Sequence, residues 1–212
     1  MITKRQKFWD KQARNYDYSE RQFEPAFKEI ILQTKSYLTL DDNILDFGCA
    51  TGTKTIELAG LVKQIQGLDI STEMIIEANK KIVERNFTNV NFTQGDIFDS
   101  KFDNAAFDKI ISYGVIHLLD DCERTINRIH KLLKPNGLFI SSTACLKGQM
   151  ALKNRLEFYA YLLIKKLGIF PLHLNMFLPE NVETIMINQG FEIVKAETIL
   201  HGITISFIIA KR

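Results

Sequence analysis

ILDFGCATGTKT, at residues 44–55, is the stretch of sequence that decides the fold. It begins with an apolar run typical of a buried strand, continues through a turn of small residues, and ends where a helix can start. A second apolar run, QIQGLDIS at residues 64–71, places Asp69 at the end of another strand. In a doubly wound parallel sheet, an acid at this position accepts hydrogen bonds from ribose hydroxyls. Together the two stretches predict a nucleoside-binding site.

The turn itself differs from the glycine pattern of dinucleotide-binding proteins. In the pattern G-x-G-x-x-G, the second glycine lets the backbone approach a pyrophosphate, and here that position is Ala50. Asp46, two residues before the first glycine, would repel a pyrophosphate but would attract an ammonium or sulfonium group. The sequence therefore weakens the case for NAD and favours a nucleoside cofactor that carries a positive charge.

Further motifs follow in a fixed order. Asp46-x-Gly48-Cys49-x-x-Gly52 and Asp69 are followed by Gly95-Asp96-Ile97, by FDKIISYGVIHLL at residues 107–119 and by LLKPNGLFI at residues 132–140. This series resembles that of the class I S-adenosylmethionine-dependent methyltransferases. FWDKQARNYD, residues 8–17, resembles the opening of their small-molecule branch, which includes the quinone-biosynthesis methyltransferases. The likeness covers residues 8–144 closely and the remainder loosely.

The resemblance implies S-adenosylmethionine as the cofactor and a role for each motif. Asp69 would accept from both ribose hydroxyls, Asp46 would bind the methionyl ammonium, and Asp96 would accept from the adenine amino group. Structural alternatives exist, since Asp46 can cap a helix, Asp96 can be a turn residue, and Tyr16 can anchor the N-terminal segment to the body. The expected cofactor-binding residues are Tyr16, Asp46, Gly48, Cys49, Ala50, Gly52, Asp69, Ile70, Met74, Asp96, Ile97, Tyr113 and Gly114.

Methyl transfer from a sulfonium is an in-line displacement that depends on alignment and on exclusion of water. A catalytic base is needed only for some acceptors. His117, just after the expected strand 107–113, is the one candidate base, although a histidine in the apolar run VIHLL is also a common structural residue. The spacing of histidines and cysteines indicates no metal site.

Composition narrows the function. The 212 residues are 46% hydrophobic and 25% charged, which is typical of one globular domain, so residues 1–212 are expected to form a single unit. The net charge of +2 is too small to indicate nucleic acid as a partner. The strand 107–113 also lacks the D-P-P-Y or N-P-P-Y signature expected of amino-methylating nucleic-acid enzymes of this fold. A small-molecule acceptor is therefore favoured.

Cysteine use and hydropathy predict the location. The three cysteines, at positions 49, 122 and 145, show no C-x-x-C spacing, which indicates a reduced, cytoplasmic protein. No apolar run approaches the roughly 20 residues that a membrane span needs, and the charged N-terminus does not resemble a signal peptide.

The alternation of strand and helix patterns predicts an α/β fold. We expect a doubly wound, seven-stranded, mostly parallel sheet that ends in an antiparallel C-terminal hairpin, with a helical arm at residues 1–36. The expected strands are 43–47, 64–69, 90–94, 107–113, 138–143, 191–199 and 203–210, and helices are expected at 4–14, 20–36, 121–134, 147–167 and 179–189.

Residues 145–178 interrupt this alternation and are rich in large apolar side chains. They are expected to form a helical cap that covers an apolar or aromatic acceptor, and a homodimer surface is the alternative use of the same segment. The most economical function is methyl transfer from S-adenosylmethionine to a small molecule. Two rivals remain: a non-catalytic S-adenosylmethionine-binding regulatory or interaction protein, and a NAD-dependent oxidoreductase.

Overall fold

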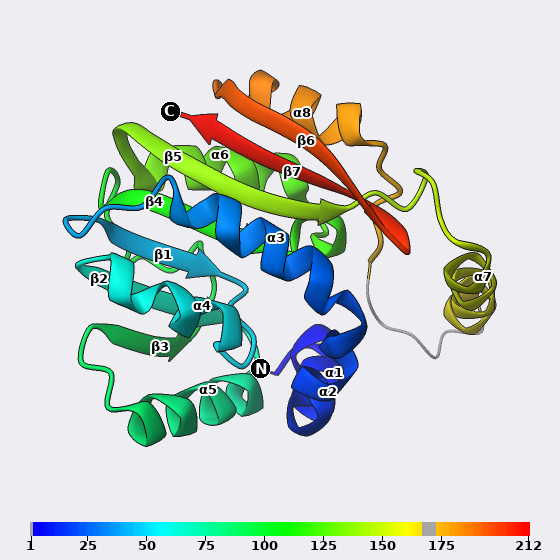
Figure 1. The fold of residues 1–212 in the computed structure, drawn as a ribbon, viewed down its shortest axis with the longest axis horizontal. Helices are drawn as coiled ribbons and strands as arrows, with labels where there is room; N and C mark the ends of the chain where they lie inside the picture. The colour runs from blue at the N-terminus through cyan, green and yellow to red at the C-terminus, as the bar shows by residue number, and fades with distance from the viewer. Residues whose placement is uncertain (1, 167–172) are drawn as a thin grey trace.

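The computed structural model describes residues 2–166 and 173–212, which form a seven-stranded sheet between two layers of helices (Figure 1). The strand order is β3-β2-β1-β4-β5-β7-β6, in which β7 runs antiparallel to β5 and to β6 and the other pairs are parallel. This confirms the predicted fold class and the closing hairpin. The strands are β1 (Asn43–Phe47), β2 (Gln64–Asp69), β3 (Val90–Gln94), β4 (Phe107–Tyr113), β5 (Leu133–Ala144), β6 (Glu192–His201) and β7 (Ile203–Lys211).

Each face of the sheet has its own core. Apolar side chains of α3, α4 and α5 pack on one face, whereas those of α6 and α8 pack on the other. The helices are α1 (Lys4–Gln12), α2 (Tyr16–Glu20), α3 (Glu24–Lys35), α4 (Thr53–Leu58), α5 (Thr72–Arg85), α6 (Cys122–Leu132), α7 (Leu152–Lys166) and α8 (Pro179–Asn188). Single 3-10 turns lie at η1 (Ala13–Asn15), η2 (Arg21–Phe23), η3 (Ala59–Leu61) and η4 (Ile116–Leu118).

Local sequence explains where the helices after β2 and β4 begin. Ser71 is in an extended conformation and its hydroxyl accepts from the Met74 amide, so it caps α5. Asp121 caps α6 by accepting from the Arg124 amide. Both caps bring a helix start to the carboxyl edge of the sheet, where partial positive charge favours anionic or polar groups.

Several boundaries differ from the sequence prediction, and the largest differences are at three elements. The helix expected at 20–36 is divided into the end of α2, η2 and α3. β5 begins at Leu133 rather than at residue 138, because Leu133 pairs with Phe107 across a register shift and the intervening Asn136 takes a φ of 65°. The helix expected at 147–167 begins only at Leu152, because Met150 first bridges to Ile203 of β7.

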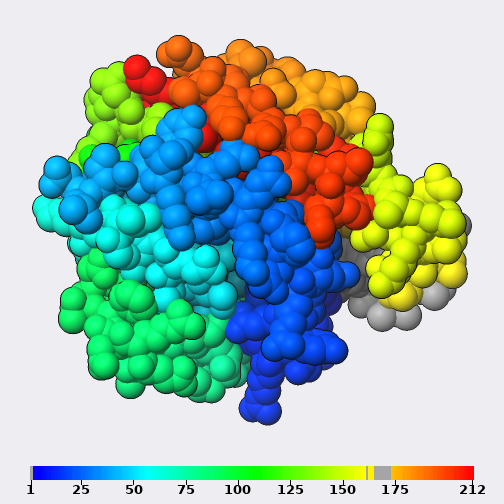
Figure 2. All heavy atoms as spheres, in the orientation of Figure 1, coloured from blue at the N-terminus to red at the C-terminus, as the bar shows by residue number. Residues whose placement is uncertain are grey.

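Two segments lie outside the core layers. Residues 4–23, from α1 to η2, form what we call the N-terminal strap, which lies against α5 (Figure 2). The second segment is α7, which projects from the side of the molecule (Figures 1 and 2). Residues 167–172, part of the expected cap, lie outside the described residues. Within the described part of the chain, no helix has the length and apolar character needed to cross a membrane.

Candidate functional site

The turn after β1 holds three residues in left-handed backbone conformations. Gly48 has a φ of 78° and Gly52 a φ of 73°. A Cβ atom on Gly48 would lie 2.3 Å from Val115, and one on Gly52 would lie 2.2 Å from the Phe92 ring, so packing as well as conformation requires glycine. Ala50 has a φ of 48°, which is unusual for a residue with a side chain.

Asp69, at the end of β2, faces this turn. Its Oδ2 accepts from the Ala50 amide at 3.1 Å and its Oδ1 accepts from the Ser71 amide at 2.8 Å. Burial raises the pKa of Asp69 to about 6, although these two hydrogen bonds lower it. Each carboxylate oxygen has a second lone pair, so Asp69 can accept two further hydrogen bonds from a diol.

Asp46, at the tip of β1, is almost fully buried. The Thr55 hydroxyl of α4 donates to its Oδ2 at 2.5 Å. Burial raises the pKa of Asp46 to about 7, while the Thr55 hydrogen bond and the nearby Lys54 charge lower it. A carboxylate this poorly solvated gains from a cationic partner, so the residue fits an ammonium or sulfonium group.

Two cavities meet at the turn. The Asp69 cavity, about 290 Å³, is lined by Arg5, Trp9, Tyr16, Phe47, Gly48, Ala50, Leu68, Asp69, Ile70, Met74, Gly95, Asp96, Ile97, Phe98, Tyr113, Gly114, Val115, Leu118, Leu119, Asp120, Asp121, Arg124 and Thr125. The Asp46 cavity, about 250 Å³, is lined by Tyr16, Asp17, Glu20, Arg21, Glu24, Phe27, Lys28, Ile31, Asp46, Gly48, Cys49, Ala50, Thr51, Thr53, Lys54, Glu57 and Tyr113. A ligand with a nucleoside at one end and a charged group at the other could extend through both.

Two tyrosines lie where the cavities adjoin. Tyr16 comes from the strap, and its pKa is raised well above the ordinary value by burial and by the carboxylates of Glu20 and Asp69. Tyr113 ends β4, and its hydroxyl hydrogen-bonds the Thr34 hydroxyl at 2.8 Å. Burial keeps the Tyr113 pKa well above its ordinary value. Both phenols therefore stay neutral at physiological pH.

Comparison with known proteins decides the family. The model of a family described as a methyltransferase domain matches residues 38–189 of this chain. The chain belongs to this methyltransferase domain family. The match covers the turn, both acids and every strand from β1 to β5. It confirms the resemblance to the class I S-adenosylmethionine-dependent methyltransferases that the motif series indicates.

Individual relatives of this methyltransferase domain carry different names. It is 30% identical over 141 residues to a demethylmenaquinone methyltransferase of Symbiobacterium thermophilum, covering 62% of this chain and 55% of the relative. It is 36% identical over 105 residues to a malonyl-[acyl-carrier protein] O-methyltransferase of Halalkalibacterium halodurans, covering 47% of this chain and 38% of the relative. The chain thus spans about half, or less, of the length of these two relatives.

A solved structure shares the fold of this methyltransferase domain at low sequence identity. The YcgJ protein of Bacillus subtilis aligns with a TM-score of 0.70 and 14% identity, covering 87% of this chain and 98% of that chain. At this identity the similarity bears on fold alone.

Most residues expected from the sequence gather at the two cavities. Twelve of the thirteen expected cofactor-binding residues line the Asp69 cavity or the Asp46 cavity. Gly52 lines neither, and its role in the structure is packing against Phe92. Asp96 makes a turn contact by accepting from the Phe98 amide at 3.0 Å, and it lines the Asp69 cavity as well.

His117 lies in η4 and is not among the residues that line either cavity. Its Nδ1 atom is buried and has no hydrogen-bond partner within the described residues. Burial lowers the pKa of His117 to about 4, so the imidazole is neutral at physiological pH. The segment after α7 contacts the same turn, because the Asn175 amide donates to the His117 carbonyl at 2.8 Å.

Other lining residues were not expected from the sequence. Trp9 and Arg5 reach the Asp69 cavity from α1, whereas Phe27 and Lys54 meet at the Asp46 cavity, with the Lys54 Nζ 3.7 Å from the centre of the Phe27 ring. Phe27 has the helical spacing of a core residue, so its pattern gave no sign of a site. FWDKQARNYD could have indicated Trp9, since this stretch carries the family resemblance but has few core positions.

Proposed function

We propose that this protein transfers a methyl group from S-adenosylmethionine to a small-molecule acceptor. The observation that carries the proposal is the pair of acids at neighbouring strand ends, Asp69 and Asp46, which face two adjoining cavities. One acid suits a ribose diol and the other suits a cation. Membership of the methyltransferase domain family supports the same function. A dinucleotide is disfavoured because Asp46 would oppose its pyrophosphate.

The lining residues suggest where each part of the cofactor binds. The adenosine would occupy the Asp69 cavity, with Asp96 and Ile97 at the adenine and Asp69 at the ribose. The methionyl end would pass Gly48 and Ala50 into the Asp46 cavity. The cofactor supplies an electrophilic methyl group on a sulfonium. Tyr16 and Tyr113 would then flank the reacting centre and exclude water from it.

The chain contributes mainly alignment and electrostatics to this reaction. Positioning the two reactants can remove on the order of 7 to 11 kcal/mol from a displacement barrier. A base is needed only when the acceptor loses a proton, and we keep His117 as the candidate because its imidazole is neutral. It would have to reach the acceptor from η4, next to Leu118 and Leu119 of the Asp69 cavity.

The acceptor is proposed to be apolar or aromatic. The side chains of Phe27, Ile31 and Tyr113 give the Asp46 cavity an apolar wall. The relatives named above include an enzyme named for a quinone substrate. We further propose that residues 145–178 cover the bound acceptor, through their described parts 145–166 and 173–178. Homodimer formation through α7 is the alternative use of this segment.

The remaining proposals concern domain organisation, cellular location and partners. We propose a single methyltransferase domain that works in the cytoplasm without nucleic acid as a partner, in keeping with the small net charge of +2. In the part of the chain that the structure describes, no group of three or more His, Cys, Asp or Glu residues is arranged to hold a metal ion.

Calorimetric titration tests the cofactor assignment. S-adenosylhomocysteine should bind the wild type, and NADH should not. Asp69→Ala should weaken S-adenosylhomocysteine binding by about 1 to 3 kcal/mol without unfolding the protein, because it removes charge-assisted hydrogen bonds. The matched control is Asp99→Ala, since Asp99 is a partly exposed loop acid that pairs with Lys101 and lines neither cavity. Tighter binding of NADH, or an unchanged affinity in Asp69→Ala, would refute the assignment.

A thermal-shift screen then addresses the acceptor. Quinone precursors, phenols, amines and thiols are added in the presence of S-adenosylhomocysteine, and ligands that bind the native state raise its apparent stability. We expect the largest shifts from the aromatic members of the panel. Mass spectrometry of the reaction with S-adenosylmethionine then identifies the methylated atom.

A further inference from the structure

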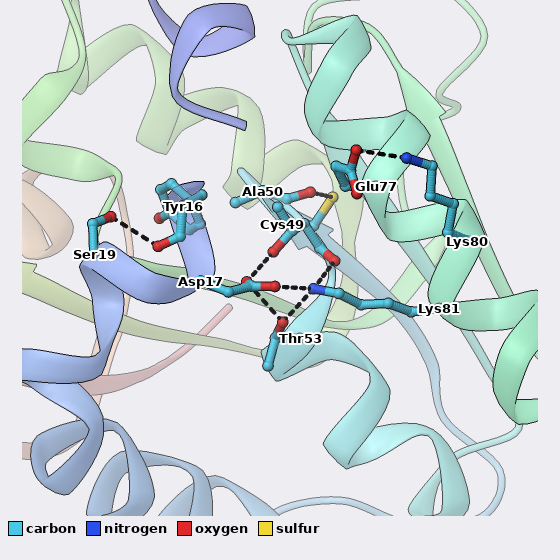
Figure 3. A network of polar contacts seen from close by, with 10 residues as sticks. Tyr16, Asp17, Ser19, Cys49, Ala50, Thr53, Glu77, Lys80 and Lys81 are labelled. Atoms are coloured by element: carbon cyan, nitrogen blue, oxygen red, sulfur yellow. Dashed lines mark hydrogen bonds and ion pairs between the residues drawn. The ribbon is translucent and has the colours of Figure 1, made fainter. Parts of the chain in front are cut away.

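One carboxylate of the N-terminal strap is bonded to two elements of the body. Asp17, in α2, accepts from the Thr51 hydroxyl at 2.5 Å. It also accepts from the Thr53 hydroxyl at 3.0 Å (Figure 3). Its other oxygen accepts from Lys81 Nζ of α5 at 2.6 Å. Thr51 and Thr53 belong to the turn after β1 and the start of α4. A single side chain therefore joins the strap to the turn and to α5.

Lys81 completes this cluster from the opposite side. Its Nζ donates to the Thr53 hydroxyl at 2.6 Å and to the Thr51 carbonyl at 3.0 Å, in addition to Asp17. The Lys81 side chain is 20% exposed and that of Asp17 is 50% exposed, so solvent screens the pair only in part. Burial of the Asp17 carboxyl raises its pKa, but hydrogen bonds from Lys81 and Thr51 and the Lys81 charge bring it below the ordinary value.

The next lysine in the sequence shows what this arrangement adds. Lys80 pairs with Glu77 of the same helix at 2.7 Å, and its side chain is 57% exposed (Figure 3). Among the described residues, that pair makes no hydrogen bond or ion pair with the strap or the turn. Exposed ion pairs of this kind contribute little to stability. Lys80 is therefore a natural control for Lys81, with the same charge and the same helix.

The position of Asp17 links the cluster to the cofactor site. Asp17 follows Tyr16 directly in α2, and Tyr16 lines both cavities. Trp9, also in the strap, lies edge-on to Tyr16 with the ring centres 6.3 Å apart and lines the Asp69 cavity. Asp10 attaches α1 separately, by accepting from the Ser71 hydroxyl at 2.7 Å. Glu20 attaches the end of α2 to Lys54 at 2.8 Å, so Asp17 is the attachment next to Tyr16 in the sequence.

We propose that Asp17 and Lys81 form a latch that holds the strap over the cofactor site, and that opening of this latch sets the rate at which the spent cofactor leaves. The proposal rests on the proposed function, because it assumes that S-adenosylhomocysteine occupies the two cavities. Asp17 and Lys81 act as positioning residues, through Tyr16 and Trp9. Breaking the latch should allow the strap to lift while the sheet and both acids keep their places.

Tryptophan fluorescence can measure the opening, because Trp9 is the one tryptophan in the sequence. The protein is loaded with S-adenosylhomocysteine and mixed in a stopped-flow instrument with excess S-adenosylmethionine or a competing adenosine analogue. Asp17→Asn and Lys81→Met should each raise the dissociation rate by about 10-fold, as expected for loss of one charge-assisted hydrogen bond. Lys80→Met should stay within about twofold of the wild type.

A double variant and a conservative variant separate latching from general stability. In the double variant Asp17→Asn/Lys81→Met, S-adenosylhomocysteine should dissociate at a rate within about twofold of the faster single variant, because both substitutions remove the same interaction. Lys81→Arg should restore slow dissociation. Melting temperatures are recorded alongside, since a purely structural role would lower them without changing the dissociation rate.

Hydrogen exchange of residues 13–20 in the free protein gives an independent measure. Lys81→Met should speed exchange there relative to Lys80→Met. If the two lysine variants match in both exchange and dissociation rate, the latch does not exist. If the wild type fails to bind S-adenosylhomocysteine, the proposed function fails and with it the role of the latch in cofactor release. Faster exchange in Lys81→Met would then still show that Lys81 holds the strap.

Discussion

The N-terminal strap and α7 both lie outside the two helical layers, but they are attached in opposite ways. The strap is polar, its one buried residue in α1 through α2 is Ala13, and it is held by ion pairs and hydrogen bonds from Arg5, Asp10 and Asp17. α7 instead exposes large apolar side chains: Leu152, Leu156, Tyr159, Leu163 and Ile164 are each more than 40% exposed.

This difference concerns which segment covers the cofactor site. Apolar content makes residues 145–178 the more obvious cap, yet Arg5, Trp9 and Tyr16 of the strap line the Asp69 cavity. No described residue of 145–178 lines either cavity. A cover for a charged cofactor can itself be polar, because it must release that cofactor after each turnover. The apolar segment is better suited to the acceptor.

Two tyrosine substitutions, one in the strap and one in α7, should show the largest difference between these segments. Tyr16→Ala in the strap should lower S-adenosylhomocysteine affinity by about 2 kcal/mol, or about 30-fold, because the ring would be buried against the ligand. Tyr159→Ala in α7 removes a side chain that is 61% exposed and should leave the affinity unchanged. Isothermal titration calorimetry of both variants measures this. Equal losses would mean that α7 also covers the cofactor.

A pH series tests the Asp46 carboxylate of the cofactor site. The Asp46 pKa of about 7 lies above its ordinary 3.8. A ligand ammonium requires the carboxylate, so affinity for S-adenosylhomocysteine should fall by up to tenfold per pH unit below about pH 7. Asp46→Asn should bind more weakly and should lose most of this dependence above about pH 6, where Asp69, with its pKa of about 6, is ionised. A wild-type affinity that is flat between about pH 6 and 7.5 would contradict the role of Asp46.

The same group should affect stability with the opposite sign. Because the folded-state pKa of Asp46 is raised, the folded protein binds the proton more tightly than the unfolded chain. The cost of burying the carboxylate is fully present above about pH 7 and is relieved as the pH falls toward 3.8. Without ligand, the free energy of unfolding of the wild type should therefore rise relative to that of Asp46→Asn as the pH falls from about 7 toward 3.8. Denaturant titrations at several pH values measure this difference.

Hydrogen exchange distinguishes the two coverings in one experiment. With S-adenosylhomocysteine alone, amides of the strap should become about fivefold more protected, which corresponds to about 1 kcal/mol, whereas amides of α7 should not change. Adding an acceptor from the thermal-shift screen should then protect residues 152–166 and 173–177. If α7 is as protected as β1 before any addition, it is core or interface, and the acceptor pocket is enclosed without it.

The smallest effect is expected on the outer face of α7. Leu156→Gln and Leu163→Gln replace side chains that are 61% and 62% exposed, so the free energy of unfolding should change by less than about 0.5 kcal/mol. Calorimetry measures the change in unfolding free energy, and light scattering measures the molecular mass in solution. A fall in molecular mass in the variants would identify α7 as a homodimer surface, and reduced turnover with unchanged mass would support the cap.

Much of the fold was predictable because its signals are local. Apolar strands ending in Asp46 and Asp69, the Ser71 cap, and the glycines at 48 and 52 are each determined by a few adjacent residues. The family match and the sheet order confirm the fold class drawn from them. The early start of β5 was not predictable, because Pro135 and Gly137 indicate a turn and only pairing with β4 extends the strand.

The site was predictable where a strand end places a residue, and not where distant segments meet. Asp46, Asp69 and Asp96 follow strands, so their position at one edge of the sheet follows from parallel topology. The contact of Asp17 with Lys81 joins residues 64 positions apart. Both read as ordinary surface charges on helices, and no periodicity distinguishes Lys81 from Lys80. Such contacts depend on the tertiary packing of the strap.

Ala50 gives the turn after β1 a property that glycine would not. Its methyl group makes the left-handed conformation costly by roughly 1 kcal/mol, but it also reduces the number of conformations open to the unfolded chain. The amide that points at Asp69 is thereby held in one direction by the surrounding contacts. A nucleoside that reaches Asp69 meets an acceptor that is already oriented, so little conformational entropy is lost at the turn on binding. The turn and Asp69 are therefore preorganised for the nucleoside, and the conformational change on binding is expected in the strap.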